Sequence, residues 1–296
     1  VEVRFGGTVH EWMDHGKFKA AQVGYQSVMA VPHDFYISGY HADAANKLTL
    51  WSATVPHGFD MAAFSRGDYA RALEQNTMAE TISKVLYPAD DHIEGKRLRL
   101  KQQYLLVSAS LQTILKEHCK QYGTLTNLAD KVAVHINDTH PALCVPELMR
   151  LLVDQYEMGW DEAWDITCKC LSYTNHTVMG EALEKWPLDL MRSVVPEIVD
   201  IICRIDQKLK WEHPDLFIVK DNTAHMANLS IYVGSYINGV AEIHTQILKN
   251  DCFKDWYYAF PERFQNKTNG ITPRRWLGLC NPELTAMLRE KVGGDF

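Results

Sequence analysis

The sequence lacks several features that would assign it quickly to a class of protein. No apolar run approaches the roughly 20 residues that a helix needs to cross a membrane. No secretory signal opens the chain, because Val1–Phe5 alternates in the manner of a strand already in progress. There is also no internal repeat or low-complexity tract. These absences argue against a membrane-spanning or exported protein, and the strand-like start predicts a piece of a longer polypeptide.

Clustered basic residues are also missing. The 37 acidic residues outnumber the 30 lysines and arginines, the net charge is −7, and the one basic run, Lys96–Lys101, is short. Proteins that bind nucleic acid gather positive charge, so no nucleic-acid partner is expected. The seven cysteines are scattered, and Cys168 and Cys170 should face different directions on a predicted helix. We interpret the cysteines as reduced thiols, which suits a cytoplasmic protein.

What the chain does contain is an alternation of strand and helix patterns over 296 residues, 46% of them hydrophobic. This alternation predicts an α/β fold. Strands are expected at Val1–Phe5, Val23–Val31, Lys47–Trp51, Val132–Ile136 and Leu216–Val219. Helices are expected from Asp68 to just before Pro88, and over Lys96–Lys120, Ala142–Tyr156, Trp160–Leu171, Glu181–Trp186, Leu188–Lys210, His225–Val240 and Ala241–Asn250, with a last helix capped by Asn281.

The run Phe264–Trp276 is the most informative segment. Asn269 and Gly270 predict a tight turn, because both residues tolerate a positive φ angle. Thr272 and Pro273 then predict an N-cap and the first turn of a helix. Free N–H groups at that helix start would point toward the turn, where a polar or anionic ligand could bind. An ordinary junction between a loop and a helix explains the same residues equally well.

Two further polar segments follow apolar elements. Asp138 and His140 come directly after the strand Val132–Ile136, and ligands of α/β proteins bind beyond the carboxyl ends of parallel strands. Asp138 could accept hydrogen bonds from a polar ligand and His140 could donate them, although Asp138 or Thr139 could instead cap the next helix. His176 lies in a polar break after an apolar helix, where a hydrogen-bonded buried histidine is the simplest interpretation.

Two other kinds of site stay open from the residues alone. A glycosidase would pair Asp90 or Asp91 with Asp138 or Glu94, although no pair stands out by its spacing. A metal site could draw on Asp138, His140 and His176, but no helical histidine pair or cysteine cluster supports it.

Four segments in order carry a resemblance to a known family: Val85–Asp91 with Leu98–Gln102, Ile136–Pro141, Tyr173–Thr177 and Phe264–Trp276. Together they resemble the α-glucan phosphorylases, which act on glycogen, starch and maltodextrin, over nearly the whole chain. The resemblance implies an internal segment of a two-domain, GT-B-like enzyme. Residues 1–268 would be the later part of the N-terminal glucan-binding and dimerisation domain, and residues 269–296 the start of the C-terminal cofactor-binding domain.

The resemblance also implies roles for individual residues. The backbone carbonyl of His176 would stabilise positive charge at the anomeric carbon, while its ring and Asn269 would contact the 6-hydroxyl of the sugar. Asp90 would lie near the glucosyl site and Tyr87 near the acceptor sugar. The catalytic channel would also be lined by Asp91, Arg99, Asp138, His140 and Thr177, and Trp276 would lie beside the pyridoxal phosphate ring. Ala89 and Asp91 replace asparagines of the muscle and liver enzymes, which suggests a bacterial-type member.

The implied reaction is the reversible phosphorolysis of an α-1,4-glucan from its non-reducing end. It would consume inorganic phosphate, give α-D-glucose 1-phosphate with retention, and depend on pyridoxal 5′-phosphate. The family's cofactor-binding lysine would lie beyond residue 296, so the isolated chain should be inactive. The helix at residues 68–86 would form a homodimer contact. A non-catalytic glucan-binding or dimer-forming fragment is the alternative.

Overall fold

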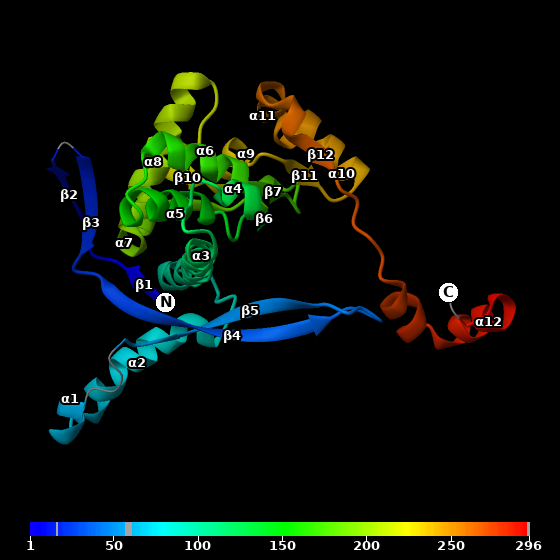
Figure 1. Ribbon diagram of the computed structural model, residues 1–296, viewed down its shortest axis with the longest axis horizontal. Helices are drawn as coiled ribbons and strands as arrows, with labels where there is room; N and C mark the ends of the chain where they lie inside the picture. Colours follow the sequence, from blue (N-terminus) through cyan, green and yellow to red (C-terminus); the bar gives the residue numbers. More distant parts are fainter. Residues whose placement is uncertain (16, 57–60, 295–296) are drawn as a thin grey trace.

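The computed structural model describes residues 1–15, 17–56 and 61–294. Figure 1 shows a body of helices around a small sheet, a long two-stranded hairpin beside it, and a C-terminal segment that extends away from the body. The sheet in the body is parallel and has helices packed around it, so the predicted α/β class is confirmed. Among the described residues, no helix is both long and apolar enough to cross a bilayer.

The first part of the chain is antiparallel, and the β-rich start is confirmed. Its strands are β1 (Glu2–Phe5), β2 (Thr8–Asp14), β3 (Lys17–Val23), β4 (Gln26–Ser38) and β5 (Ala45–Thr54). β4 pairs with both β1 and β5, while β2 and β3 form a separate hairpin. The strand predicted at Val23–Val31 begins later, at Gln26, because Gly24 has a φ of 66° and separates β3 from β4.

The helices α2 (Tyr69–Lys84) and α3 (Ile93–Tyr122) pack on β5 of the β4–β5 hairpin. α1 (Met61–Ser65) leads into α2, which ends before Pro88 as predicted. α3 is confirmed as well, and its 30 residues make it about 45 Å long. The His92 side chain caps its start by accepting from Gly95 N, and Gly123 ends it in the left-handed conformation.

The parallel sheet contains β6 (Val134–Asn137), β7 (Leu171–Thr174), β11 (Ile237–Gly239) and β12 (Phe264–Asn266), in the order β12-β11-β7-β6. The strand predicted at Val132–Ile136 exists, but β6 is the outermost strand of the sheet and buries only the Ile136 side chain. β7, β11 and β12 were not predicted, because their three or four residues are too few to show a period.

The helices around this sheet are α4 (Leu128–Lys131), α5 (Cys144–Arg150), α6 (Trp160–Cys170), α7 (Leu188–Val194), α8 (Pro196–Glu212), α9 (Met226–Val233), α10 (Glu242–Ile247) and α11 (Lys254–Ala259). α5 continues into a π-helical turn, Leu151–Gln155, and a second such turn at Leu248–Cys252 follows α10. α5 contacts α3, α6, α8 and α9, so it is the centre of the hydrophobic core.

Three predicted helices are wrong in whole or in part. The segment Glu181–Trp186 contains a short 3-10 turn and then β8 (Lys185–Pro187), which buries Trp186 against β10 (Thr223–His225). The helix expected over 188–210 breaks before Pro196, because proline has no N–H to continue the helical bonding. The helix expected over 225–240 ends at Gly234, and the rest forms β11.

The small strand expected at Leu216–Val219 begins later, as β9 (Val219–Lys220), which pairs with β10.

The C-terminal segment differs from its prediction at its start. Residues 267–272 form no turn, and neither Asn269 nor Gly270 has a positive φ angle. A helix begins at Pro273 as predicted: Trp276 N donates to Thr272 O at 3.0 Å, and the π-helix Arg274–Leu279 follows. Its N-cap position is Pro273 and it has no side-chain cap, so the side-chain cap predicted from Thr272 is not found. α12 (Pro282–Val292) begins as predicted, because the Asn281 side chain accepts a hydrogen bond from Leu284 N.

Candidate functional site

The carboxyl edge of the parallel sheet gathers three of the predicted segments. Asp138 N donates to Thr174 O at 3.0 Å, and Asn175 N donates to Asn238 O at the same distance. On the next strand pair, Asn269 N donates to Val240 O at 2.9 Å. The segments that carry Asp138, His176 and Asn269 therefore leave the sheet at one edge, which is where open α/β sheets bind ligands.

The segment after β6 is held by its own side chains. Asp138 has a φ of 62°, and its Oδ1 accepts a hydrogen bond from Thr139 N at 2.6 Å. Neither Asp138 nor Thr139 caps α5, whose N-cap position is Leu143, so the capping interpretation is wrong. Thr139 is buried while the His140 side chain is 45% exposed, which leaves the imidazole available to a ligand.

His176 is exposed, so the interpretation of this residue as a buried histidine is wrong. Its Nε2 lies 2.6 Å from Asn137 Oδ1, which makes Nε2 the donor and holds the ring against the end of β6. The preceding residue, Asn175, is the buried one, and it bonds the Tyr173 hydroxyl and Thr177 N at 3.0 Å each. The backbone at His176 is therefore anchored from both sides.

The segment between α2 and α3 carries Tyr87, Asp90 and Asp91, all exposed. Tyr87 has a φ of 55°, a conformation that a bulky residue seldom adopts, and its side chain extends into solvent. Arg99 Nη1 lies 3.4 Å from Asp90 Oδ2, and its guanidinium lies 5.8 Å from the Tyr87 ring centroid. Because its side chain is only 22% exposed, Arg99 is not on a freely solvated helix face.

Glu184 connects these segments and was not recognised in the sequence. Its Oε1 accepts from Gln103 Nε2 at 2.7 Å and forms ion pairs with Arg99 Nε at 3.6 Å and His140 Nδ1 at 3.9 Å. No local pattern distinguishes it, since a single glutamate between Leu183 and Lys185 is ordinary. Through Glu184 and Arg99, the structure links His140 to Asp90.

The electrostatics of this cluster favour a charged pair. The Glu184 carboxylate raises the pKa of His140 above its usual value, although partial burial and the Arg99 guanidinium oppose this. Burial would raise the pKa of Glu184, but His140, Gln103 and Arg99 lower it overall. At neutral pH, Glu184 is therefore ionised and favours protonated His140.

A cavity of about 150 Å³ lies beside the cluster and is lined by Tyr87, Arg99 and His140, together with Leu86, Gln102, Gln103 and Leu106. Three of the predicted site residues thus share one cavity. It is smaller than the cavities of about 300–1,000 Å³ that hold drug-sized ligands, so it would hold only part of such a ligand.

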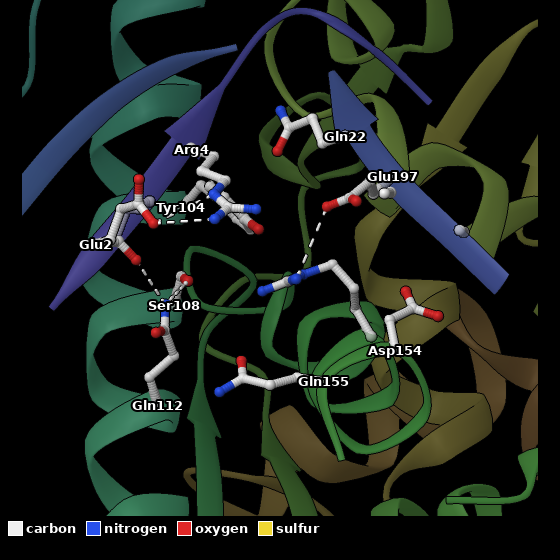
Figure 2. A pocket seen from close by; sticks show the side chains of 13 residues that line it. Glu2, Arg4, Gln22, Tyr104, Ser108, Gln112, Asp154, Gln155 and Glu197 are labelled. Atoms are coloured by element: carbon white, nitrogen blue, oxygen red, sulfur yellow. Dashed lines mark hydrogen bonds and ion pairs between the residues drawn. The ribbon is translucent and has the colours of Figure 1, made fainter. Parts of the chain in front are cut away.

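A larger polar cavity, of about 340 Å³, lies elsewhere between β1, β3, α3 and α8 (Figure 2). Behind it, the fully buried Glu147 accepts hydrogen bonds from Arg150 Nε at 2.7 Å, Tyr104 Oη at 2.8 Å and Ser108 Oγ at 2.6 Å. Burial raises the pKa of Asp154 in its lining to about 6. No predicted site residue lines this cavity, so it is not part of the site at the sheet edge.

Trp276 lies apart from the carboxyl ends of the parallel strands. It is 63% exposed and belongs to the π-helix of the C-terminal segment, which Figure 1 shows extending away from the body. The neighbouring Arg274 contacts the Tyr40 ring near the tip of the β4–β5 hairpin, at 5.2 Å from the centroid. Within the described part of the chain, Asp138, His140 and His176 do not form a three-ligand metal cluster.

A sequence model of the family described as carbohydrate phosphorylase matches residues 1–296 of this chain. The chain belongs to the carbohydrate phosphorylase family. It is 45% identical to the glycogen phosphorylase of Chlamydia pneumoniae, an alignment that covers 99% of the chain and 38% of that protein. The muscle form of human glycogen phosphorylase is 44% identical, with 96% of the chain and 36% of that protein covered. This phosphorylase chain therefore spans a little more than a third of the length of these relatives.

The phosphorylase chain does not by itself fit pyridoxal phosphate, the cofactor that the family resemblance implies. The large cavity beside the π-helix is lined by Arg274 and Arg289, whose guanidinium groups could bind a phosphate. It has no lysine in its described lining to form a Schiff base, and Trp276 does not line it.

Proposed function

We propose that this chain forms one wall of the active site of an α-glucan phosphorylase. The enzyme would catalyse the reversible phosphorolysis of an α-1,4-glucan from its non-reducing end, giving α-D-glucose 1-phosphate with retention. The observation that carries this proposal is the meeting of the segments of Asp138, His176 and Asn269 at one sheet edge. It is supported by the identity of 43–45% to proteins named glycogen phosphorylase.

In this proposal, the residues at the sheet edge bind and orient one glucose unit. Positive charge develops on the sugar in an oxocarbenium-like transition state, and fixed carbonyl dipoles near it lower the barrier. The backbone at His176 is suited to this role, because the side chain of the flanking Asn175 bonds Tyr173 and Thr177, while the His176 ring bonds Asn137. Arg99, His140 and the carboxylate of Asp90 supply hydrogen-bonding groups along the adjoining channel.

The wider architecture is part of the same proposal. Residues 1–268 would belong to the N-terminal domain of a GT-B-like enzyme, and residues 269–296 would begin the C-terminal domain that binds pyridoxal phosphate. A homodimer would form through residues 68–86, where Tyr69, Leu73 and Met78 of α2 are exposed apolar side chains. We also propose a cytoplasmic location, in line with the scattered reduced cysteines.

The test uses the complete protein that contains these residues, incubated with maltodextrin in the presence and absence of inorganic phosphate. Strictly phosphate-dependent formation of glucose 1-phosphate is expected, and release of free glucose without phosphate would indicate a glycosidase instead. The variant His176→Ala should lose most of this activity. Glu162→Gln, an exposed substitution on α6, should retain it. The 296-residue chain alone should give no glucose 1-phosphate.

A further inference from the structure

Glu184 is a largely buried carboxylate that contacts more polar and charged groups than a purely structural residue needs. Its side chain is 10% exposed, and its Oε1 alone faces Gln103, Arg99 and His140. Its Oε2 is buried without any hydrogen-bond partner. A buried acceptor left unpaired costs free energy, and such groups in native structures are concentrated where function requires them.

Glu184 is also where three separate parts of the chain converge. Arg99 and Gln103 come from α3, His140 comes from the segment after β6, and Glu184 itself precedes β8. Arg99 continues the chain of contacts to Asp90 in the segment between α2 and α3. Arg99 and His140 line the same cavity, whereas Glu184 lies behind them and does not line it.

We propose that Glu184 is a positioning residue, which holds Arg99 and His140 in the orientation that binds the glucan. This inference rests on the proposed function, because it assigns the role of a group behind that same site. Glu184 does not touch the substrate. Its carboxylate fixes the guanidinium from one side and favours the protonated imidazole, so that His140 can donate a hydrogen bond into the cavity.

The charges around His140 determine how its pKa changes when the Glu184 charge is lost. Glu184 and Asp138 favour the protonated imidazole, while burial and Arg99 oppose it. If Glu184 becomes neutral, the pKa of His140 therefore falls. In a titration toward alkaline pH, His140 then loses its proton at a lower pH than in the wild type. Activity that needs protonated His140 declines at that lower pH as well.

The test uses the complete phosphorylase that contains this chain, with the variants Glu184→Gln and Glu184→Asp. The values of kcat and KM for maltodextrin are measured across the pH range in which histidine titrates. For Glu184→Gln we expect kcat/KM to fall by about 10- to 100-fold, because hydrogen bonds to charged groups contribute about 1.5–3 kcal/mol. The alkaline decline of kcat/KM should also move to lower pH.

Glu184→Asp keeps the negative charge, but its side chain is shorter by one methylene group, so the carboxylate lies farther from Arg99 and His140. It should lower kcat/KM but leave the alkaline decline of kcat/KM at the same pH as in the wild type. If Glu184→Gln folds poorly, Glu184→Asp alone still tests the proposal through its kcat/KM. Glu162→Gln makes the same chemical change on an exposed helix face and should change neither quantity. An alkaline decline that stays in place in folded Glu184→Gln, or an unchanged kcat/KM in Glu184→Asp, would overturn the proposal.

These results are distinguishable from a failure of the proposed function. If the wild-type enzyme produces no glucose 1-phosphate, the function itself is wrong, and the role assigned to Glu184 falls with it. If the wild-type enzyme is active, the variants test Glu184 alone.

Discussion

Replacing Arg150 by leucine tests how far the fold depends on the buried network around Glu147. The Glu147 side chain is 0% exposed, and Arg150 donates to both of its oxygens, at 2.7 and 2.8 Å. Arg150→Leu leaves this carboxylate in the core with only the hydroxyls of Tyr104 and Ser108 as partners. Removing one partner of a buried ion pair typically costs about 3–5 kcal/mol, so we expect a loss of that size.

The loss is measured as the change in the free energy of unfolding, by chemical denaturation followed through tryptophan fluorescence. Arg192→Leu is the matched control, because Arg192 pairs with Asp200 at 3.7 Å and both side chains are about half exposed. That variant should lose less than about 1 kcal/mol. Similar losses in the two variants would refute the argument that burial makes the Arg150 pair important.

Three other substitutions have clear expected results. Asp154→Asn should stabilise the protein by about 1–2 kcal/mol at neutral pH, seen in urea denaturation, because burial raises the pKa of Asp154 to about 6 and solvent screens part of that cost. The gain should begin to shrink as the pH falls below about 6, where the folded wild type takes up the proton, and it should be gone near pH 3.8, the ordinary pKa of the carboxyl. Gly95→Ala should lower the thermal unfolding temperature, because its Cβ would lie 1.7 Å from Ala89 O. Asn137→Ala should raise KM for maltodextrin about 10-fold, because the loss of one hydrogen bond of about 1.4 kcal/mol frees the His176 ring.

Each of these predictions has its own refuting outcome. Equal stability of Asp154→Asn and wild type at neutral pH would contradict the raised pKa of the aspartate. Gly159→Ala is the control for the glycine variant, because a Cβ there meets no atom within 4 Å, and it should be tolerated. If the two glycine variants unfold at the same temperature, the close approach at Gly95 does not limit stability. For Asn137→Ala, a change in kcat at constant KM would contradict a role in binding.

The sequence predicted the elements whose patterns run over many residues. α3 was recognisable from its apolar period, and the N-cap of α12 from the Asn281-Pro282 pair. The segments of Asp138 and His176 were predicted as site candidates, and the structure places both at the carboxyl edge of one sheet. This agreement has a physical basis, because long apolar periods and side-chain caps are encoded locally.

Other features depend on contacts that are distant in sequence. β7 and β11 are short strands that exist because they pair with each other, which no local period reveals. Trp186 was assigned to a helix, yet burial against Ala224 of β10 makes its segment a strand. Glu184 was missed for the same reason, since its importance comes from Arg99 and His140, which are far from it along the chain.

Because α3 is a single continuous helix, it connects the proposed glucan site to the hydrophobic core. Gln103 donates a hydrogen bond to Glu184, and the next residue, Tyr104, donates one to Glu147 in the buried network. Any slide or rotation of the helix must disturb both carboxylates at once. If the proposed function holds, substitutions that loosen the core around Tyr104 should therefore also alter the affinity for the glucan.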